Sequence, residues 1–215
     1  MTAPTTFDDL PYGPRFARAL PFLHRAFLIV NRRFAAPMLR AGLGSLLSTP
    51  VTGSMMLLRT RGRRSGAVRE APLGYVIWHG AIYCVAGFGG TTHWFRNLLA
   101  DPHVECVLPA VAVSGVAEAV TDPAEWAAAY EALIRSMGVI GRLTVGDVRE
   151  LAPEALDQQR QAFPLVRIRP DGIAPGAFDP GGLGWLPAIA MEAWLTVGAA
   201  RLGFRCLRAI GRRVD

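Results

Sequence analysis

The sequence contains no lysine, only three cysteines and only four histidines among its 215 residues. Without lysine, a Walker phosphate-binding loop is excluded, because the lysine of that loop contacts the nucleotide phosphates. The cysteines (Cys84, Cys106 and Cys206) are odd in number and far apart, so they predict no disulfide framework and a reducing, cytoplasmic compartment. The histidines lack the spacing of metal ligands, so no metal site is expected.

Two further kinds of site are missing. No nucleophile, base and carboxylate occur in a pattern that suggests a hydrolytic triad. The run from Gly87 to Gly90 has Thr92 where a dinucleotide fingerprint needs its third glycine, and no βαβ unit surrounds it.

The first residues are polar and include Asp8 and Asp9, so a secretory signal is not expected.

Because lysine is absent, arginine carries all of the positive charge that is counted at pH 7, and the formal net charge is +6. The distribution of the arginines is uneven: residues 1–50 carry six arginines against two aspartates, and residues 201–213 carry five arginines and no acid. A positive field of this kind favours an anionic partner. Because no nucleic-acid motif is present, nucleic acid is not the expected partner.

The most informative stretch is residues 55–75. An apolar run from Met55 to Leu58 predicts a strand, Gly62 and Gly66 predict a turn, and a second strand begins at Val68. Five arginines lie within this stretch, at positions 59, 61, 63, 64 and 69. Arginine presents a planar fork that suits phosphate or carboxylate, and flanking glycines let backbone N–H groups approach an anion. The pattern favours a preformed anion site over the alternative, a solvated charged turn.

The rest of the chain predicts a small barrel. His79-Gly80 has the form of a two-residue hairpin turn, and Asp122 followed by Pro123 and Glu125 predicts a capped helix. Six strands with few helices between them favour a mainly β, α+β fold over a doubly wound sheet. The expected strands are 55–61, 68–77, 81–87, 103–109, 111–120 and 163–170, and the expected helices are 93–100, 123–137 and 146–161.

Two motifs carry a family resemblance. The first is the turn Gly62, Arg63, Arg64, Ser65, Gly66, followed by Arg69, Pro72 and Leu73. The second is the Gly-rich strand end Gly87, Gly89, Gly90, followed by Trp94, Phe95, Asn97 and Leu98. In this order and at this distance, they resemble the deazaflavin-dependent nitroreductase and quinone reductase family.

The resemblance implies a split β-barrel of the flavin-reductase type that uses coenzyme F420, a deazaflavin with a phosphate and a polyglutamate tail. The implied activity is hydride transfer to a quinone, a nitroaromatic or another electron-poor small molecule, with no catalytic side chain because the cofactor carries the chemistry. Related barrels are often dimers, so the resemblance is compatible with a homodimer but leaves the oligomeric state open. The implied cofactor-binding residues are Arg63, Arg64, Ser65, Gly66, Arg69, Pro72, Leu73, Gly87, Gly89, Trp94, Phe95 and Asn97, and the substrate residues are Gly74, Tyr75 and His93.

Two alternatives stay open beside this interpretation. One is a non-catalytic, membrane-associated barrel that binds a lipid such as a fatty acid. The other is the same barrel holding FMN or haem.

The expected organisation is an N-terminal helical segment (1–50) interrupted at Pro21 and Pro37, the barrel (51–170), and a linker with a C-terminal amphipathic helix (171–215). Residues 185–200 are almost entirely apolar, and arginines at helical spacing follow them. This pattern favours a helix that lies on an anionic membrane at the inner face of the cell membrane. The alternatives are a helix that packs on the N-terminal helices and buries Glu192 against an arginine, and a true membrane span.

Overall fold

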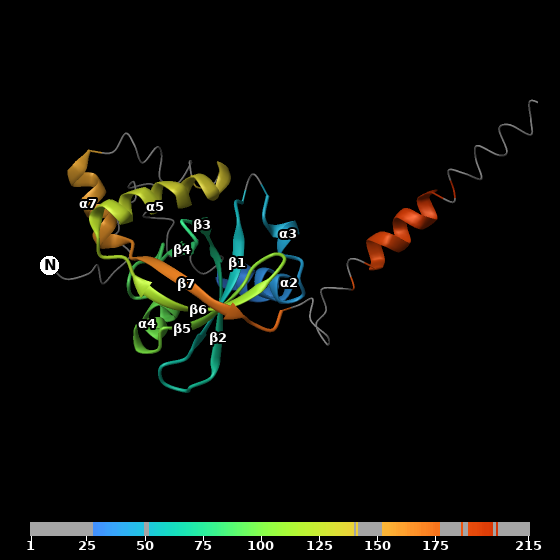
Figure 1. Ribbon diagram of the computed structural model, residues 1–215, viewed down its shortest axis with the longest axis horizontal. Coiled ribbons are helices and arrows are strands. Elements are labelled where there is room, and N and C mark those ends of the chain that lie inside the picture. The colour runs from blue at the N-terminus through green and yellow to red at the C-terminus, as the bar shows by residue number, and fades with distance from the viewer. Residues whose placement is uncertain are drawn as a thin grey trace, which may run out of the picture.

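The structure, a computed structural model, describes residues 28–49, 52–139, 141, 152–176, 186, 189–199 and 201. Its body is one antiparallel sheet of seven strands in the order β2-β1-β5-β6-β7-β4-β3 (Figure 1). The strands are β1 (Met55–Arg61), β2 (Val68–Gly74), β3 (Val76–Trp78), β4 (Ala81–Val85), β5 (His103–Val107), β6 (Ala112–Ala119) and β7 (Leu165–Ile173). The helices are η2 (Asn31–Ala35), α2 (Ala36–Arg40), α3 (Gly44–Leu47), α4 (His93–Ala100), α5 (Pro123–Ser136) and α7 (Pro153–Ala162).

The sheet curls around one apolar interior. Alternate residues of β1, β4, β5 and β7 meet there, because side chains of a strand point to opposite faces in turn. The buried members of this interior are Met56, Leu58, Ile82, Cys84, Ala86, Phe95, Leu98, Val104, Cys106, Ala117, Val166 and Ile168. The predicted mainly β, split-barrel fold class is therefore confirmed, with seven strands instead of about six.

The additional strand comes from a break at Tyr75, where the sequence predicts one strand over 68–77. β2 and β3 lie at opposite edges of the sheet, so one continuous strand could not form both. At the break, the Tyr75 N–H donates to the Ser54 carbonyl at 3.1 Å, and the Ser136 hydroxyl donates to the Tyr75 carbonyl at 2.9 Å. These bonds replace the ladder and redirect the chain across the open side of the barrel.

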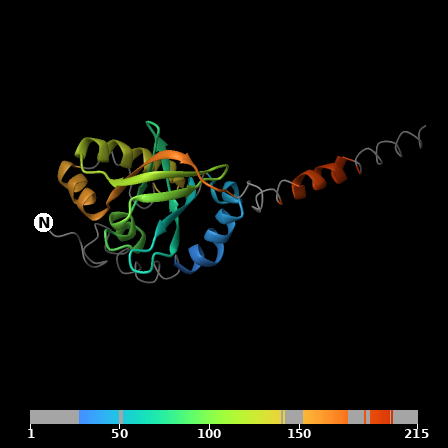
Figure 2. The same ribbon diagram turned by 60° about the horizontal axis from the view of Figure 1, so that its bottom comes forward.

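Helices cover the outer face of the sheet on two sides (Figure 2). The helix α5 packs Trp126 and Leu133 on Tyr83 and Leu165, whereas α2 packs Leu39 on residues that include Leu57 and Val107. Because both faces of β4 and of the first half of β1 are buried, these segments read as continuous apolar runs.

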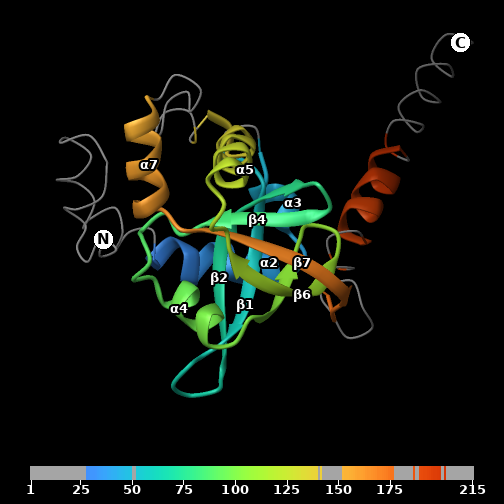
Figure 3. The ribbon, with the colours of Figure 1, turned by 60° about the vertical axis from the view of Figure 1, so that its left-hand side comes forward.

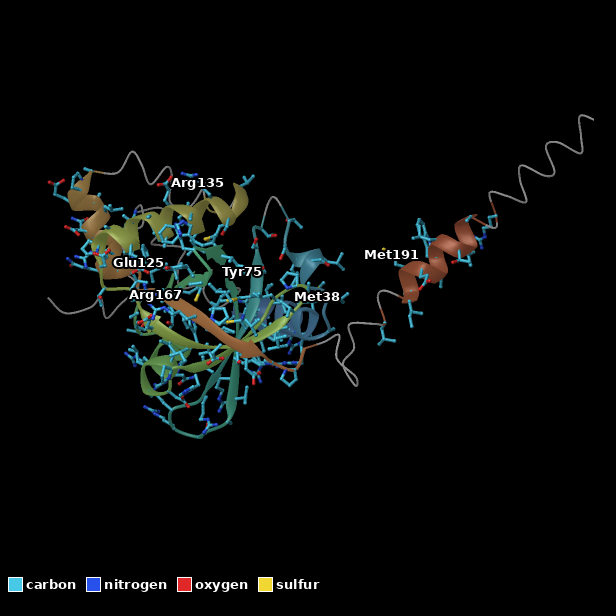
Figure 4. The ribbon with its side chains drawn as sticks, in the orientation of Figure 1. Met38, Tyr75, Glu125, Arg135, Arg167 and Met191 are labelled. Atoms are coloured by element: carbon cyan, nitrogen blue, oxygen red, sulfur yellow. The ribbon has the colours of Figure 1, made fainter. Side chains whose placement is uncertain are left out.

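The predicted start of α5 is confirmed. The Asp122 carboxylate accepts from the Glu125 N–H at 2.7 Å, and Pro123 is the first helical residue. The Glu125 carboxylate accepts from the Tyr83 hydroxyl at 2.8 Å and from Arg167 Nη1 at 2.6 Å, and Figure 4 shows Glu125 beside Arg167. Polar contacts as well as apolar packing therefore hold α5 on the sheet.

The predicted interruption at Pro37 is wrong. Residues 28–40 run as one helix, in which the wide turn of η2 precedes α2 and the Ala36 N–H donates to the Asn31 carbonyl. A proline clashes with the carbonyl four residues earlier, and a π-type turn relieves that clash without ending the helix. The predicted helices within 14–27, Pro21 included, lie outside the described residues.

At the other end, β7 continues to Ile173, three residues past the expected end of the barrel.

A helix over residues 189–199 lies apart from the barrel in the three ribbon views, and all of its residues are exposed. Glu192 is therefore not buried against an arginine of the N-terminal helices, as one alternative required. In the described part of the chain, no helix is both long and apolar enough to cross a bilayer. Binding at a membrane surface stays a prediction.

The cap of α5 gives a test of local stability. Asp122→Ala removes the acceptor for the Glu125 N–H, so we expect the free energy of unfolding to fall by about 1 kcal/mol. Urea unfolding followed by circular dichroism measures it. The control is Gln158→Ala, at an exposed position within α7. Equal stability of the Asp122→Ala variant and the wild type would show that the cap contributes nothing.

Candidate functional site

The turn between β1 and β2 is closed by its own backbone. The Gly62 N–H donates to the Ala67 carbonyl at 2.8 Å, and the Ser65 and Gly66 N–H groups donate to the Gly62 carbonyl at 3.2 and 2.7 Å. The Ala67 N–H donates to the Ser65 hydroxyl at 3.4 Å. These N–H groups already donate hydrogen bonds within the turn, so they do not form the anion site that the sequence predicts from the backbone. Its available donors are mainly side chains.

Two glycines make this closure possible. Gly66 has φ +67°, a conformation that residues with a side chain rarely adopt. At Gly62, a Cβ atom would lie 3.0 Å from the Ala67 carbonyl oxygen and 3.1 Å from Ser65 Oγ. The sequence places both glycines where the fold requires them.

The structure divides the five arginines of the hairpin into two groups. Arg59 lies between Glu70 and Glu105, with N–O distances of 3.2 and 3.3 Å. Arg61 lies 3.6 Å from the carboxylate of Asp101. The charges of Arg59 and Arg61 are thus balanced by carboxylates of β2, β5 and the segment after α4.

Glu70 also accepts from Arg40 of α2, so it binds two arginines. Burial of the Glu70 carboxyl acts to raise its pKa, but the hydrogen bonds and charges of Arg40 and Arg59 outweigh this effect and hold the pKa below its ordinary value. The carboxylate stays charged and fastens the N-terminal helix to β2.

The second group consists of Arg63, Arg64 and Arg69. All three are exposed, and none forms an ion pair within the described part of the chain. Arg69 Nη2 donates to the Ser65 hydroxyl at 3.4 Å, which brings together two residues of the predicted set. These three guanidinium groups at one turn form a local positive site with donors left for a ligand.

Beneath the turn, Asn97 joins three segments of the chain. It is 4% exposed, and its side-chain oxygen lies 3.3 Å from the Arg63 N–H and 3.1 Å from Arg63 Nη1. Its amide nitrogen donates to the hydroxyl of Thr60, which is also buried, at 3.3 Å. Asn97 therefore lies behind Arg63 and orients it, and Thr60 is a supporting residue that the sequence did not single out.

The Gly-rich segment is a tight turn that starts α4. The Gly89 N–H donates to the Ala86 carbonyl at 2.8 Å with φ +76° at Gly89, and the Thr92 hydroxyl donates back to the Gly89 carbonyl at 3.1 Å. Gly90 packs against Pro164 and Phe95, and Gly87 lies partly exposed in the same turn. The helix α4 thus begins at the second motif and reaches the first through Asn97 (Figure 3).

Apolar residues of the predicted set pack on the barrel interior. Leu73, Tyr75 and Trp94 are partly buried and pack against the core, and Phe95 lies inside it, 7% exposed. Burial raises the pKa of the Tyr75 phenol, so that group stays neutral near pH 7. Pro72 is buried within the edge strand β2, and His93 is the exposed first residue of α4.

Gly74 and Tyr75 lie at the end of β2 that is remote from the arginines. Met137 Cγ lies 3.5 Å from where a Gly74 Cβ would stand, and Ser136 binds the Tyr75 carbonyl. No sequence signal linked this end of α5 with β2. The two ends of β2 are separated by about 20 Å at roughly 3.3 Å per residue. Along β2, the predicted cofactor residue Arg69 and the predicted substrate residues Gly74 and Tyr75 therefore lie at opposite ends, whereas His93 lies on α4.

Other reactive groups are held inert. Burial raises the pKa of the Cys84 thiol well above its ordinary value and that of Cys106 to about 12, so both stay protonated. Among the residues that the structure describes, no three His, Cys, Asp or Glu side chains come together in a way that could hold a metal ion.

The contact between Asn97 and Arg63 can be measured. Asn97→Ala leaves the Thr60 hydroxyl buried without this partner, so we expect the free energy of unfolding to fall by about 1–3 kcal/mol. In a double-mutant cycle with Arg63→Ala, urea unfolding should give a coupling energy of at least about 0.5 kcal/mol. The matched control is the cycle with Arg64→Ala, which should be additive. Equal coupling in the two cycles would contradict the assignment.

Comparisons with known proteins complete the description of the site. No curated protein matches the chain in sequence. Among solved structures, an F420 reductase is 21% identical, with 60% of this chain and 94% of that chain covered and a TM-score of 0.39. A heme-binding protein from Mycobacterium smegmatis is 17% identical (62% and 51% covered, TM-score 0.41). The heme storage protein HutZ from Vibrio cholerae is 20% identical (63% and 92% covered, TM-score 0.41).

A family model described as F420H(2)-dependent quinone reductase matches residues 32–139. That range makes up half of the chain. It contains both motifs, the first of which includes the arginine turn, and it contains all of α4 and α5. The chain therefore belongs to the F420H(2)-dependent quinone reductase family, a family of oxidoreductases.

Proposed function

We propose that this protein reduces a quinone with coenzyme F420 and that the arginine turn holds the anionic part of the cofactor. The observation that carries the proposal is the set of three exposed guanidinium groups, at Arg63, Arg64 and Arg69, without ion pairs in the described chain. When bound in its reduced form, the cofactor supplies the hydride.

The hydrogen-bond donors at the turn fit the anionic part of the cofactor. Phosphates and carboxylates accept charge-assisted hydrogen bonds, and arginine presents two parallel donors to each. Arg63 is oriented by Asn97 and Arg69 by Ser65, so two of the three side chains lose little freedom on binding. Arg64, which has no such contact in the described chain, would add charge with less fixed geometry.

The other group of residues supports the reaction by its apolar character. Leu73, Tyr75 and Trp94 are partly buried against the apolar interior, and side chains of this kind could pack on a ring system and exclude water from it. A ligand that touched both Tyr75 and the arginine turn would have to extend along most of β2. A cofactor with a ring at one end and an anionic tail at the other suits that arrangement. Nitroaromatics are a second acceptor class with the same electron-poor character.

The alternatives predict different ligands. A barrel for FMN or haem would show the absorbance of that group after purification, and a lipid-binding barrel would release a fatty acid on extraction. Fluorescence titration compares the cofactors directly: we expect tighter binding of F420 than of FMN, because its tail offers more anionic groups to the turn. Equal or stronger binding of FMN would contradict the proposal.

The role of the turn is tested with Arg64→Gln. A charge-assisted hydrogen bond contributes roughly 1.5–3 kcal/mol, so we expect the Kd for F420 to rise about tenfold or more. The kcat at saturating cofactor should stay within about twofold, because the arginine holds the tail and not the reacting ring. The matched control is Arg61→Gln, which removes the same charge from the same hairpin at a carboxylate-paired position. A collapse of kcat would place Arg64 at the reacting centre instead.

The absence of an essential side-chain acid is tested at His93. This residue is exposed at the start of α4, so His93→Ala should retain at least about a tenth of the wild-type kcat. Steady-state rates with a soluble quinone between pH 6 and pH 8 measure it. A loss of more than about a hundredfold would identify His93 as a proton donor.

A further inference from the structure

The helix over residues 28–40 has two different halves. Its second half is anchored: Ala35, Ala36 and Leu39 are buried against the sheet. Its first half carries four large apolar side chains that remain in solvent. These are Leu28, Ile29, Val30 and Phe34, which are 53%, 59%, 51% and 63% exposed.

We define these four residues, with the exposed Arg32 and Arg33 between them, as the Leu28–Phe34 patch. An exposed group of large apolar side chains on an ordered helix marks a surface that another body covers.

From the composition of this patch, we infer that the protein docks on an anionic membrane surface through residues 28–34. Phenylalanine and aliphatic side chains can enter the boundary between headgroups and acyl chains, while arginines reach anionic headgroups beside them. The surrounding sequence favours the same occupant, since no Asp or Glu occurs between Asp9 and Glu70. Nothing in that stretch would repel an anionic lipid.

Other occupants fit the patch less well. In a symmetric contact with a second copy, the patch would face itself and bring Arg32 and Arg33 of both copies together. No acidic residue of this helix could balance them. Nucleic acid would pair with the arginines, but it would leave the four apolar side chains without a partner.

Docking through this patch would also orient the candidate site. The η2 segment lies beside β2, and Arg40 of the same helix forms an ion pair with Glu70 of that strand. The helix and the β1–β2 hairpin are therefore directly connected. The inference does not rest on the identity of the cofactor, and vesicle binding is measured without it.

The experiment is co-sedimentation of the full-length protein with vesicles. Phosphatidylcholine vesicles that contain phosphatidylglycerol should pellet the wild type, pure phosphatidylcholine vesicles should not, and added salt should weaken binding. Ile29→Asp/Phe34→Asp should abolish pelleting while circular dichroism shows a folded protein. The matched control, Ile77→Asp/Leu99→Asp, makes the same change at two positions that are each 60% exposed, and it should still pellet.

A second pair of variants separates location from net charge. Arg32→Gln/Arg33→Gln should lower the apparent affinity about thirtyfold, at roughly 1 kcal/mol per arginine near an anionic surface. Arg135→Gln/Arg169→Gln removes the same charge at two ion-paired positions elsewhere and should have less than a third of this effect.

Four outcomes would overturn the inference. The wild type could stay in the supernatant with both vesicle types, or it could bind both vesicle types equally. The Ile29→Asp/Phe34→Asp variant could pellet like the wild type, or both aspartate pairs could lose binding alike. Light scattering that shows a dimer for the wild type and a monomer for the Ile29→Asp/Phe34→Asp variant would identify a second copy as the occupant.

Discussion

The structure depends on a sheet that buries both of its faces. Alternate residues of its strands share one interior, and the residues between them pack under α5 and α2. On β1, Met56 and Leu58 point inward while Leu57 points outward, and all three are fully buried. The chain must cross from one edge of the sheet to the other at Tyr75 to close this arrangement. That crossing places Tyr75 against the core.

The arginine turn gains its properties from the same framework. The pairing of β1 with β2 and β5 brings Glu70 and Glu105 to Arg59, and the chain after α4 brings Asp101 to Arg61. The three remaining arginines of the hairpin form no ion pair within the part of the chain that the structure describes. Asn97 reaches Arg63 only because α4 packs against the start of the turn. Family membership and this donor set together support a deazaflavin as the ligand.

Two positive surfaces of the protein differ in kind. The arginine turn is polar, and its exposed guanidinium donors suit the phosphate or carboxylate groups of a small ligand. The Leu28–Phe34 patch mixes arginines with large apolar side chains, which suits a surface that is apolar beneath an anionic layer. The ion pair between Arg40 and Glu70 connects the helix of the patch with the hairpin of the turn.

The sequence by itself determined the local elements of this protein. The apolar runs predicted most strands, His79-Gly80 and Asp122-Pro123 predicted a turn and a cap, and two glycines marked the arginine turn, because neighbouring residues decide these features. Tertiary structure decided the break at Tyr75, the continuous helix through Pro37, and the ion pairs of Arg59 and Arg61. Arg59 and Glu105 are 46 residues apart, so their ion pair forms only when the strands between them pair. Contacts at such a separation depend on the register of the sheet, which no local pattern records.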